Sequence, residues 1–150
     1  MNYGEFLLTL MHSSTNTQIL HRQTKSYAEH VALGEFYEAI IPLVDTLTEA
    51  IQGLEGEIID YPVDYYGPAA SGLEELSSLQ EYVAEERKGL PANSEIQNVV
   101  DEIADLINST LYKLKFLKWL SLGWELRPLY WGLFFGKKAV ENLQIGVVIF

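Results

Sequence analysis

Apolar residues recur every three or four positions along most of this chain, which is the spacing of one face of an α-helix. The pattern predicts a first helix over residues 3 to about 25, interrupted by the polar run SSTNTQ. It is most regular over residues 28–52, where a second helix is predicted, with Ser26 or Tyr27 near its start and Gly53 just after its end. Both helices would bury an apolar stripe and leave a polar face exposed.

Residues 54–70 contain two prolines and three tyrosines, a composition that indicates a long connection and not a helix. Beyond it the apolar pattern resumes and predicts a third helix over residues 71 to about 88. A fourth helix, capped by Asn93 or Ser94, is predicted to continue to about residue 120. Four amphipathic helices with a long crossover between the second and the third indicate an all-α, ferritin-like four-helix bundle.

The end of the chain has a different character, being hydrophobic and aromatic and containing all three tryptophans. We therefore divide the chain into a bundle over residues 1–118 and an atypical C-terminal extension of unknown role over residues 119–150. Charged residues interrupt the extension, so no apolar run approaches the ~20 residues of a membrane-spanning helix. A basic amphipathic face, which a membrane-surface anchor would need, is also lacking. The pattern thus predicts no membrane span, and a membrane-surface anchor stays a third and weaker interpretation of the extension.

Charge is distributed unevenly along the chain. The formal net charge is -11, and residues 54–105 carry 13 acidic and 2 basic side chains, whereas residues 106–150 carry 2 acidic and 6 basic ones. A surface of this sign repels phosphate, and the first 20 residues contain no Lys or Arg that could form a DNA-binding arm. We therefore expect no nucleic acid partner. The same surface would attract cations.

The chain contains no cysteine. This excludes disulfides, thiolate-bound zinc, iron–sulfur clusters and cysteine nucleophiles, and it fits a reducing compartment. Any bound metal must therefore use His, Asp or Glu side chains or water. The N-terminal residues show neither a basic region nor a small-residue cleavage site, so no signal peptide is predicted. A cytoplasmic location is the resulting expectation.

Four side chains have the types expected of transition-metal ligands: His21, His30, Asp45 and Glu49. Asp45 and Glu49 are four residues apart on the second predicted helix, so they share one face and lie within ~6 Å of each other at Cβ. His30 precedes Asp45 by fifteen residues, which is ~22 Å along a helix. A single ion cannot touch both residues within one chain.

A two-fold dimer would resolve this separation. If the second helix packs antiparallel against its copy in another subunit, the His30 end of one chain meets the Asp45 and Glu49 end of the other. His21, near the end of the first helix, would join His30 from the same side. Each of two equivalent sites would then combine two imidazoles and two carboxylates from different chains.

The segment from His21 to Gly53 resembles the ferroxidase segment of the Dps mini-ferritins, and it is closest to ferritin-like proteins encoded by tailed phages. In that pattern one histidine ends the first helix, another begins the second, and the run Asp-Thr-x-x-Glu follows, here from Asp45 to Glu49. Residues 94–117 resemble the family loosely. The resemblance implies intersubunit sites that oxidise Fe(II) for iron detoxification or storage, in the host cytoplasm if the protein is phage-encoded. It implies these metal ligands and catalytic residues: His21, His30, Asp45 and Glu49.

The sequence departs from the mini-ferritin pattern in three ways. Its two histidines are closer together, Arg22 replaces the tryptophan that often follows the first one, and a Lys-rich DNA-binding arm is missing. These departures leave assembly into a larger shell open. They also leave an alternative function open, namely a non-enzymatic ferritin-like phage structural or interaction module without a working metal site.

The ligand chemistry suits iron, although zinc and manganese would accept the same side chains. Carboxylates stabilise Fe(III) more than Fe(II), and neutral imidazole binds Fe(II) without adding charge. In-chain di-iron ferritins carry Glu-x-x-His motifs on two helices. No such motif occurs in this sequence, which favours the arrangement between subunits.

Other titratable and aromatic residues have ordinary structural explanations. His12 lies about 180° round the helix from His21 and is expected to be a surface residue. A solvated helix face is expected for the acidic residues that precede the carboxylate pair, namely Glu29, Glu35 and Glu38. Packing is expected for the tyrosines Tyr37, Tyr65 and Tyr66.

Overall fold

The computed structural model describes residues 2–117, and within that range the chain is helical, with no strand. Its elements are α1 (Tyr3–Gln23), α2 (Tyr27–Glu55), α3 (Gly72–Glu86), the short 3₁₀ helix η1 (Arg87–Gly89) and α4 (Ser94–Phe116). The prediction of an all-α fold is therefore confirmed for this part of the chain. The predicted C-terminal extension, residues 119–150, lies outside the described residues.

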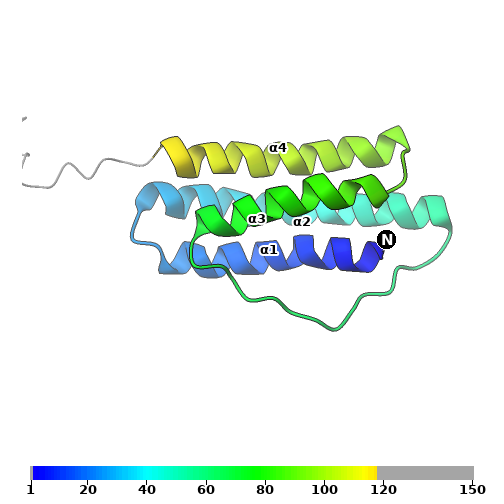
Figure 1. The fold of residues 1–150 in the computed structure, drawn as a ribbon, viewed down its shortest axis with the longest axis horizontal. Helices are drawn as coiled ribbons and strands as arrows, with labels where there is room; N and C mark the ends of the chain where they lie inside the picture. Colours follow the sequence, from blue (N-terminus) through cyan, green and yellow to red (C-terminus); the bar gives the residue numbers. More distant parts are fainter. Residues whose placement is uncertain (1, 118–150) are drawn as a thin grey trace, which may run out of the picture. The chain divides into compact units, whose positions relative to one another are not determined.

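The four α-helices pack side by side as a bundle (Figure 1). α2 contacts both α1 and α4, and α3 contacts both α4 and α1, so the helices close a ring in the order α1, α2, α4, α3. The crossover between α2 and α3 runs back along the bundle on the side of α1, which makes α3 parallel to α2 (Figure 1). The predicted long connection is thus present between the predicted pair of helices.

The core lies along the axis of the bundle and is built from the apolar stripe of every helix. Its largest fully buried side chains are Phe6, Leu7, Leu10, Leu33, Phe36, Ile40, Leu47, Ile51, Leu76, Ile96, Ile103 and Ile107. Burying a side chain of this size stabilises the folded state by about 1.5–3 kcal/mol. Two members of the predicted α2 stripe are instead partly exposed, Val31 at 38% and Ile41 at 37%. They lie on the outer side of α2, beside the acidic residues of that face.

Side-chain caps fix where three of the helices begin. Asn2, Ser26 and Ser71 each accept a hydrogen bond from a backbone N–H in the first turn of the helix that follows. The predicted start of α2 at Ser26 is therefore confirmed. The prediction that Gly53 ends α2 is wrong, because α2 continues to Glu55 and Gly56 adopts the left-handed conformation at its end, with φ 71°.

The polar run SSTNTQ does not interrupt α1, contrary to the sequence prediction. Ser13, Asn16 and Thr17 are buried there. Ser13 Oγ donates to the carbonyl of Leu10, and Thr17 Oγ1 donates to the carbonyl of Ser13. Because the hydroxyls of Ser13 and Thr17 are satisfied within the helix, these residues enter the bundle without breaking it.

No helix among residues 2–117 has the length and apolar character needed to cross a membrane.

Candidate metal centre

His21 and His30 lie against each other where α1 ends and α2 begins. Their ring centroids are 3.7 Å apart, and the ring planes differ by 22°. The connection between the two helices is short, since α1 ends at Gln23 and Ser26 caps α2. The two histidines that the sequence placed at neighbouring helix ends are therefore brought together by one turn.

Two hydrogen bonds link the histidines reciprocally. His21 Nδ1 lies 2.7 Å from the His30 carbonyl oxygen, and His30 Nδ1 lies 3.0 Å from the His21 carbonyl oxygen. A carbonyl oxygen only accepts hydrogen bonds, so each Nδ1 must carry the hydrogen. In the neutral ring the lone pair then sits on Nε2, which is the atom that binds a metal ion. The backbone thus selects the tautomer that each ring would need as a ligand.

Residues of α2 shape the space around His21. A Cβ atom added at Gly34 would lie 3.3 Å from His21 Cε1, so the missing side chain lets the ring lie close to the helix. The Tyr37 ring meets the His21 ring edge to face, with centroids 5.3 Å apart. Tyr37 is half-buried here, in line with the packing role expected for it.

Three polar residues brace the turn that carries the histidines. Thr24 Oγ1 donates to Glu29 Oε2 over 2.6 Å and accepts from the Ser26 N–H over 3.1 Å. Ser26 Oγ accepts from the Glu29 N–H over 3.3 Å. Glu29 is therefore half-buried and occupied by the turn, which corrects the expectation of a solvated position.

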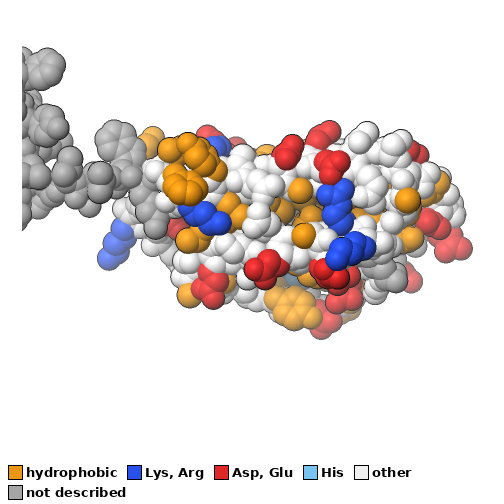
Figure 2. Space-filling view, turned by 45° about the horizontal axis from the view of Figure 1, so that its top comes forward, with side chains coloured by type: hydrophobic (Ala, Val, Ile, Leu, Met, Phe, Trp, Pro, Cys, Tyr) orange, Lys and Arg blue, Asp and Glu red, His pale blue; other side chains and the backbone are white. Residues whose placement is uncertain are grey.

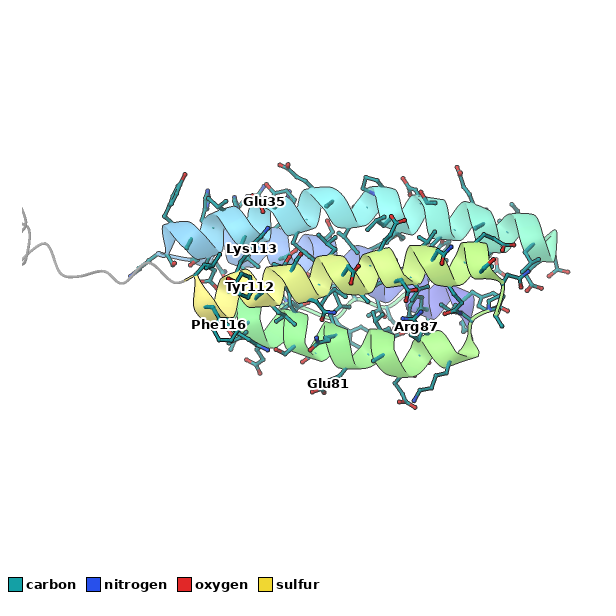
Figure 3. All side chains as sticks on the ribbon, turned by 90° about the horizontal axis from the view of Figure 1, so that it is seen from above. Glu35, Glu81, Arg87, Tyr112, Lys113 and Phe116 are labelled. Carbon is teal, nitrogen blue, oxygen red and sulfur yellow. The ribbon has the colours of Figure 1, made fainter. Side chains whose placement is uncertain are left out.

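The two other acidic residues of this face lie at the surface, as predicted. Glu35 is exposed and forms an ion pair with Lys113 of α4, and the two side chains point toward each other in Figure 3. Glu38 is exposed as well. Acidic side chains are spread over the face of the bundle seen in Figure 2 and do not gather in one patch.

Asp45 and Glu49 are both exposed on the surface of α2. Neither carboxylate has a hydrogen-bond or ion-pair partner among residues 2–117. Fifteen residues of α2 separate Asp45 from His30, which is ~22 Å at the rise per residue of an α-helix. Within the described part of the chain, no group of three or more His, Asp or Glu side chains could hold a metal ion. One chain therefore brings His21 and His30 together but not the four predicted ligands.

His12 is the residue whose environment sequence reasoning missed. It is half-buried, its ring meets the Tyr65 ring edge to face with centroids 5.0 Å apart, and its Nδ1 is buried without a hydrogen-bond partner within residues 2–117. The polar run that follows it was the available signal. It shows that this side of α1 meets polar neighbours and not the apolar core.

Comparison with known proteins places the chain in a family without assigning it an activity. No curated protein and no solved structure shows a significant match. One family model matches residues 21–114, a range that begins at His21 and includes all four predicted metal ligands. Since the match spans more than half of the chain, the protein belongs to the family of unknown function DUF5856.

Proposed function

We propose that the protein binds Fe(II) between two copies of the chain and oxidises it, as a Dps-like ferroxidase acting in iron detoxification or storage. The observation that carries this proposal is the reciprocal hydrogen bonding of His21 and His30. It presents two imidazoles whose Nε2 atoms have no partner among residues 2–117. Imidazoles with a tautomer fixed by a second hydrogen bond are typical metal ligands.

Asp45 and Glu49 complete the donor set when they come from a second subunit. Both are exposed and unpartnered within the described residues, so they are available to another chain. An antiparallel pairing of two α2 helices brings them to the histidine pair of the other copy, and the two-fold axis repeats the contact. The carboxylates would favour Fe(III) over Fe(II), and so favour oxidation. Two Fe(II) ions supply the two electrons that, with two protons, reduce one hydrogen peroxide to two waters.

Charge supports the same pairing. Arg22 and Lys25 are exposed and flank the histidine end of α2 in sequence. Asp45 and Glu49 lie toward the opposite end of the helix and are exposed too. An antiparallel arrangement brings these two basic residues of one chain toward Asp45 and Glu49 of the other, whereas a parallel one would set each acidic pair beside its own copy.

A second candidate is a non-enzymatic ferritin-like module, and one observation favours it. The hydrogen bonds between His21 and His30 join the end of α1 to the start of α2 with no need of a metal. In that case the pair would be a structural brace, and its removal would lower stability without changing any metal chemistry.

The deciding experiment measures Fe(II) oxidation, with oxygen or peroxide, by the full chain and by the double variant His30→Ala, Asp45→Ala. We expect the double variant to lose the protein-dependent part of the rate and to bind less iron. The matched control is Glu102→Ala, Asp105→Ala, which removes two exposed acids from α4. Equal oxidation rates for the wild type and the double variant would contradict the ferroxidase proposal and favour the non-enzymatic module.

A further inference from the structure

The outer surface of α4 carries an exposed aromatic pair. Tyr112 and Phe116 are four residues apart, so they share one side of the helix, and their ring centroids lie 5.6 Å apart. The two residues are 54% and 71% exposed, and the neighbouring Leu117 is 48% exposed. Figure 3 shows the pair together near the end of α4, where hydrophobic side chains also gather on the surface in Figure 2. A contiguous apolar cluster on a surface is typical of an interaction site, whereas scattered apolar residues are not.

A groove of about 460 Å³ lies between α3 and α4 on the same side of the bundle. Arg87 lines it toward the other end of α4 from the aromatic pair (Figure 3). Because two of its apolar lining residues are alanines, the groove leaves room for a large side chain from outside. The apolar lining consists of Val83, Ala84, Ala104 and Ile107.

Charge divides α4 into an acidic half and a basic half. Every acidic residue of the helix lies at or before Asp105, and both of its lysines, Lys113 and Lys115, follow. Asp105 and Lys115 are exposed, and neither has an ion-pair partner among residues 2–117. A second copy of α4 laid antiparallel sets the basic half of each helix beside the acidic half of the other. A parallel, in-register pairing would set like charges together.

The charges and the groove agree on one register for such a pairing. Asp105, Tyr112 and Phe116 are seven and four residues apart, so they lie along one outer stripe of α4. If a two-fold axis crosses the helix level with residue 110, Phe116 of one copy lies level with Ala104 of the other, and Lys115 lies level with Asp105. The aromatic pair therefore reaches the groove in the register that also pairs the free charges. Arg87 lines that part of the groove, and a guanidinium stacks favourably on an aromatic ring.

We propose that the outer face of α4 binds a second copy of this chain, antiparallel and about a two-fold axis, with the aromatic pair of each copy over the α3–α4 groove of the other. Such a contact is self-complementary, so each favourable contact is made twice. It needs no metal. It also uses α4, whereas the proposed ferroxidase contact uses α2, so the two contacts together would join dimers into a larger assembly.

The first test is sedimentation velocity of the full-length chain over a range of concentrations in EDTA, which removes the metal that the α2 contact would share. The chain should associate. The double variant Tyr112→Ser, Phe116→Ser should weaken the association about tenfold or more, because buried aromatic side chains dominate the energy of most interfaces. Val63→Ser is the matched control, since it removes an apolar side chain of the crossover that is 102% exposed. A chain that stays monomeric at every concentration, or that associates equally well without both rings, would overturn the proposal.

Exchange of charge tests the register. Asp105→Lys and Lys115→Glu should each weaken the association several-fold, because each sets two like charges level with each other. The double variant Asp105→Lys, Lys115→Glu should restore it, since the charges are then exchanged but still opposite. Circular dichroism establishes that these surface variants are folded. A double variant that associates no better than the single ones would contradict the antiparallel pairing.

Cross-linking separates this contact from the one at α2. The chain contains no cysteine, so a single introduced cysteine reports contact with its own copy. Ser109 is exposed and lies next to the proposed axis, so Ser109→Cys should form a covalent dimer with a short bis-maleimide in EDTA. Glu38→Cys, midway between His30 and Asp45, reports the α2 pairing instead. Cross-linking at Ser109 alone would support the α4 contact and count against the α2 dimer, whereas cross-linking at Glu38 alone would overturn the α4 contact.

Discussion

The three histidines of the chain have different hydrogen-bonding situations although all of them are helical residues. In His21 and His30 the backbone occupies Nδ1 and leaves Nε2 to a partner. In His12 the buried Nδ1 is the unpaired atom. The ring nitrogen without a partner therefore differs between them. In the first two histidines it is Nε2, outside the turn, whereas in the third it is an Nδ1 that the protein covers.

Tyr82 of α3 makes the stability of the bundle depend on pH in the alkaline range. Burial raises the pKa of Tyr82 above its ordinary 10.0; the Thr9 hydrogen bond lowers it, and the charges of Glu5 and Glu86 raise it. As pH rises, the Tyr82 hydroxyl therefore loses its proton in the unfolded state before it does so in the folded state. The free energy of unfolding falls as pH rises from 10 through the folded-state pKa. Tyr82→Phe should remove this part of the fall. Urea denaturation across this pH range measures it, with the exposed Tyr27→Phe as control.

Gly4 and Gly53 should respond in opposite ways to alanine. A Cβ at Gly4 would lie only 1.9 Å from the Asp60 carbonyl oxygen, so the crossover would have to move away from α1. Such overpacking destabilises by about 1–3 kcal/mol. A Cβ at Gly53 meets nothing within 4 Å inside α2, and there Gly→Ala should stabilise by about 0.5–1 kcal/mol. Thermal denaturation of both variants checks the pair. A stable Gly4→Ala would show that the crossover does not pack on α1.

At the scale of elements, the local sequence predicted the helices better than their ends. The α2 stripe is long and regular, so the existence of the helix was predictable from Leu33, Phe36 and Ile40 alone. Its end was not, because Gly53 and Gly56 are equally acceptable end signals and only the tertiary structure chooses between them.

The candidate sites were predictable to different degrees for the same reason. The contact of His21 with His30 follows from two helices joined by a short turn, so the sequence could place it. The cleft at His12 is lined by residues of α1, of α3 and of the crossover, and these segments are distant from one another in sequence. No local pattern specifies that packing.

The turn between α1 and α2 should depend on its cap more than the start of α4 does. Ser26 Oγ accepts from the Glu29 N–H, whereas the Asn93 side chain makes no capping hydrogen bond. Ser26→Ala should therefore lower the free energy of unfolding by about 1 kcal/mol, and Asn93→Ala by clearly less. Chemical denaturation of the two variants provides the comparison. Equal losses would mean that the Ser26 hydroxyl does not stabilise the turn that carries the histidines.

At the scale of the whole molecule, α2 carries His30 near one end and Asp45 and Glu49 toward the other, and these residues do not meet within one chain. Its exposed apolar residues, Val31 and Ile41, are scattered among charged ones, so burial alone gives a weak reason to pair with another copy. Complementary charge and a shared metal ion would provide a stronger reason for two copies of the chain to associate. Association of the chain should therefore increase when the metal is added, a dependence expected whenever a ligand binds the dimer alone.

Complementation between two inactive variants tests this arrangement directly. One variant, His21→Ala, His30→Ala, lacks the imidazoles, and the other, Asp45→Ala, Glu49→Ala, lacks the carboxylates. Each alone should fail to oxidise Fe(II). In a mixed dimer, the imidazoles of the second variant meet the carboxylates of the first and restore one complete site, while the other site loses both halves. Random mixing gives about half mixed dimers, and each has one of two sites, so about a quarter of the wild-type activity should return. The unmixed variants are the controls. A mixture as inactive as its components would contradict the intersubunit site. If all four ligands had to come from one chain, mixing two chains that each lack two of them could not restore a site.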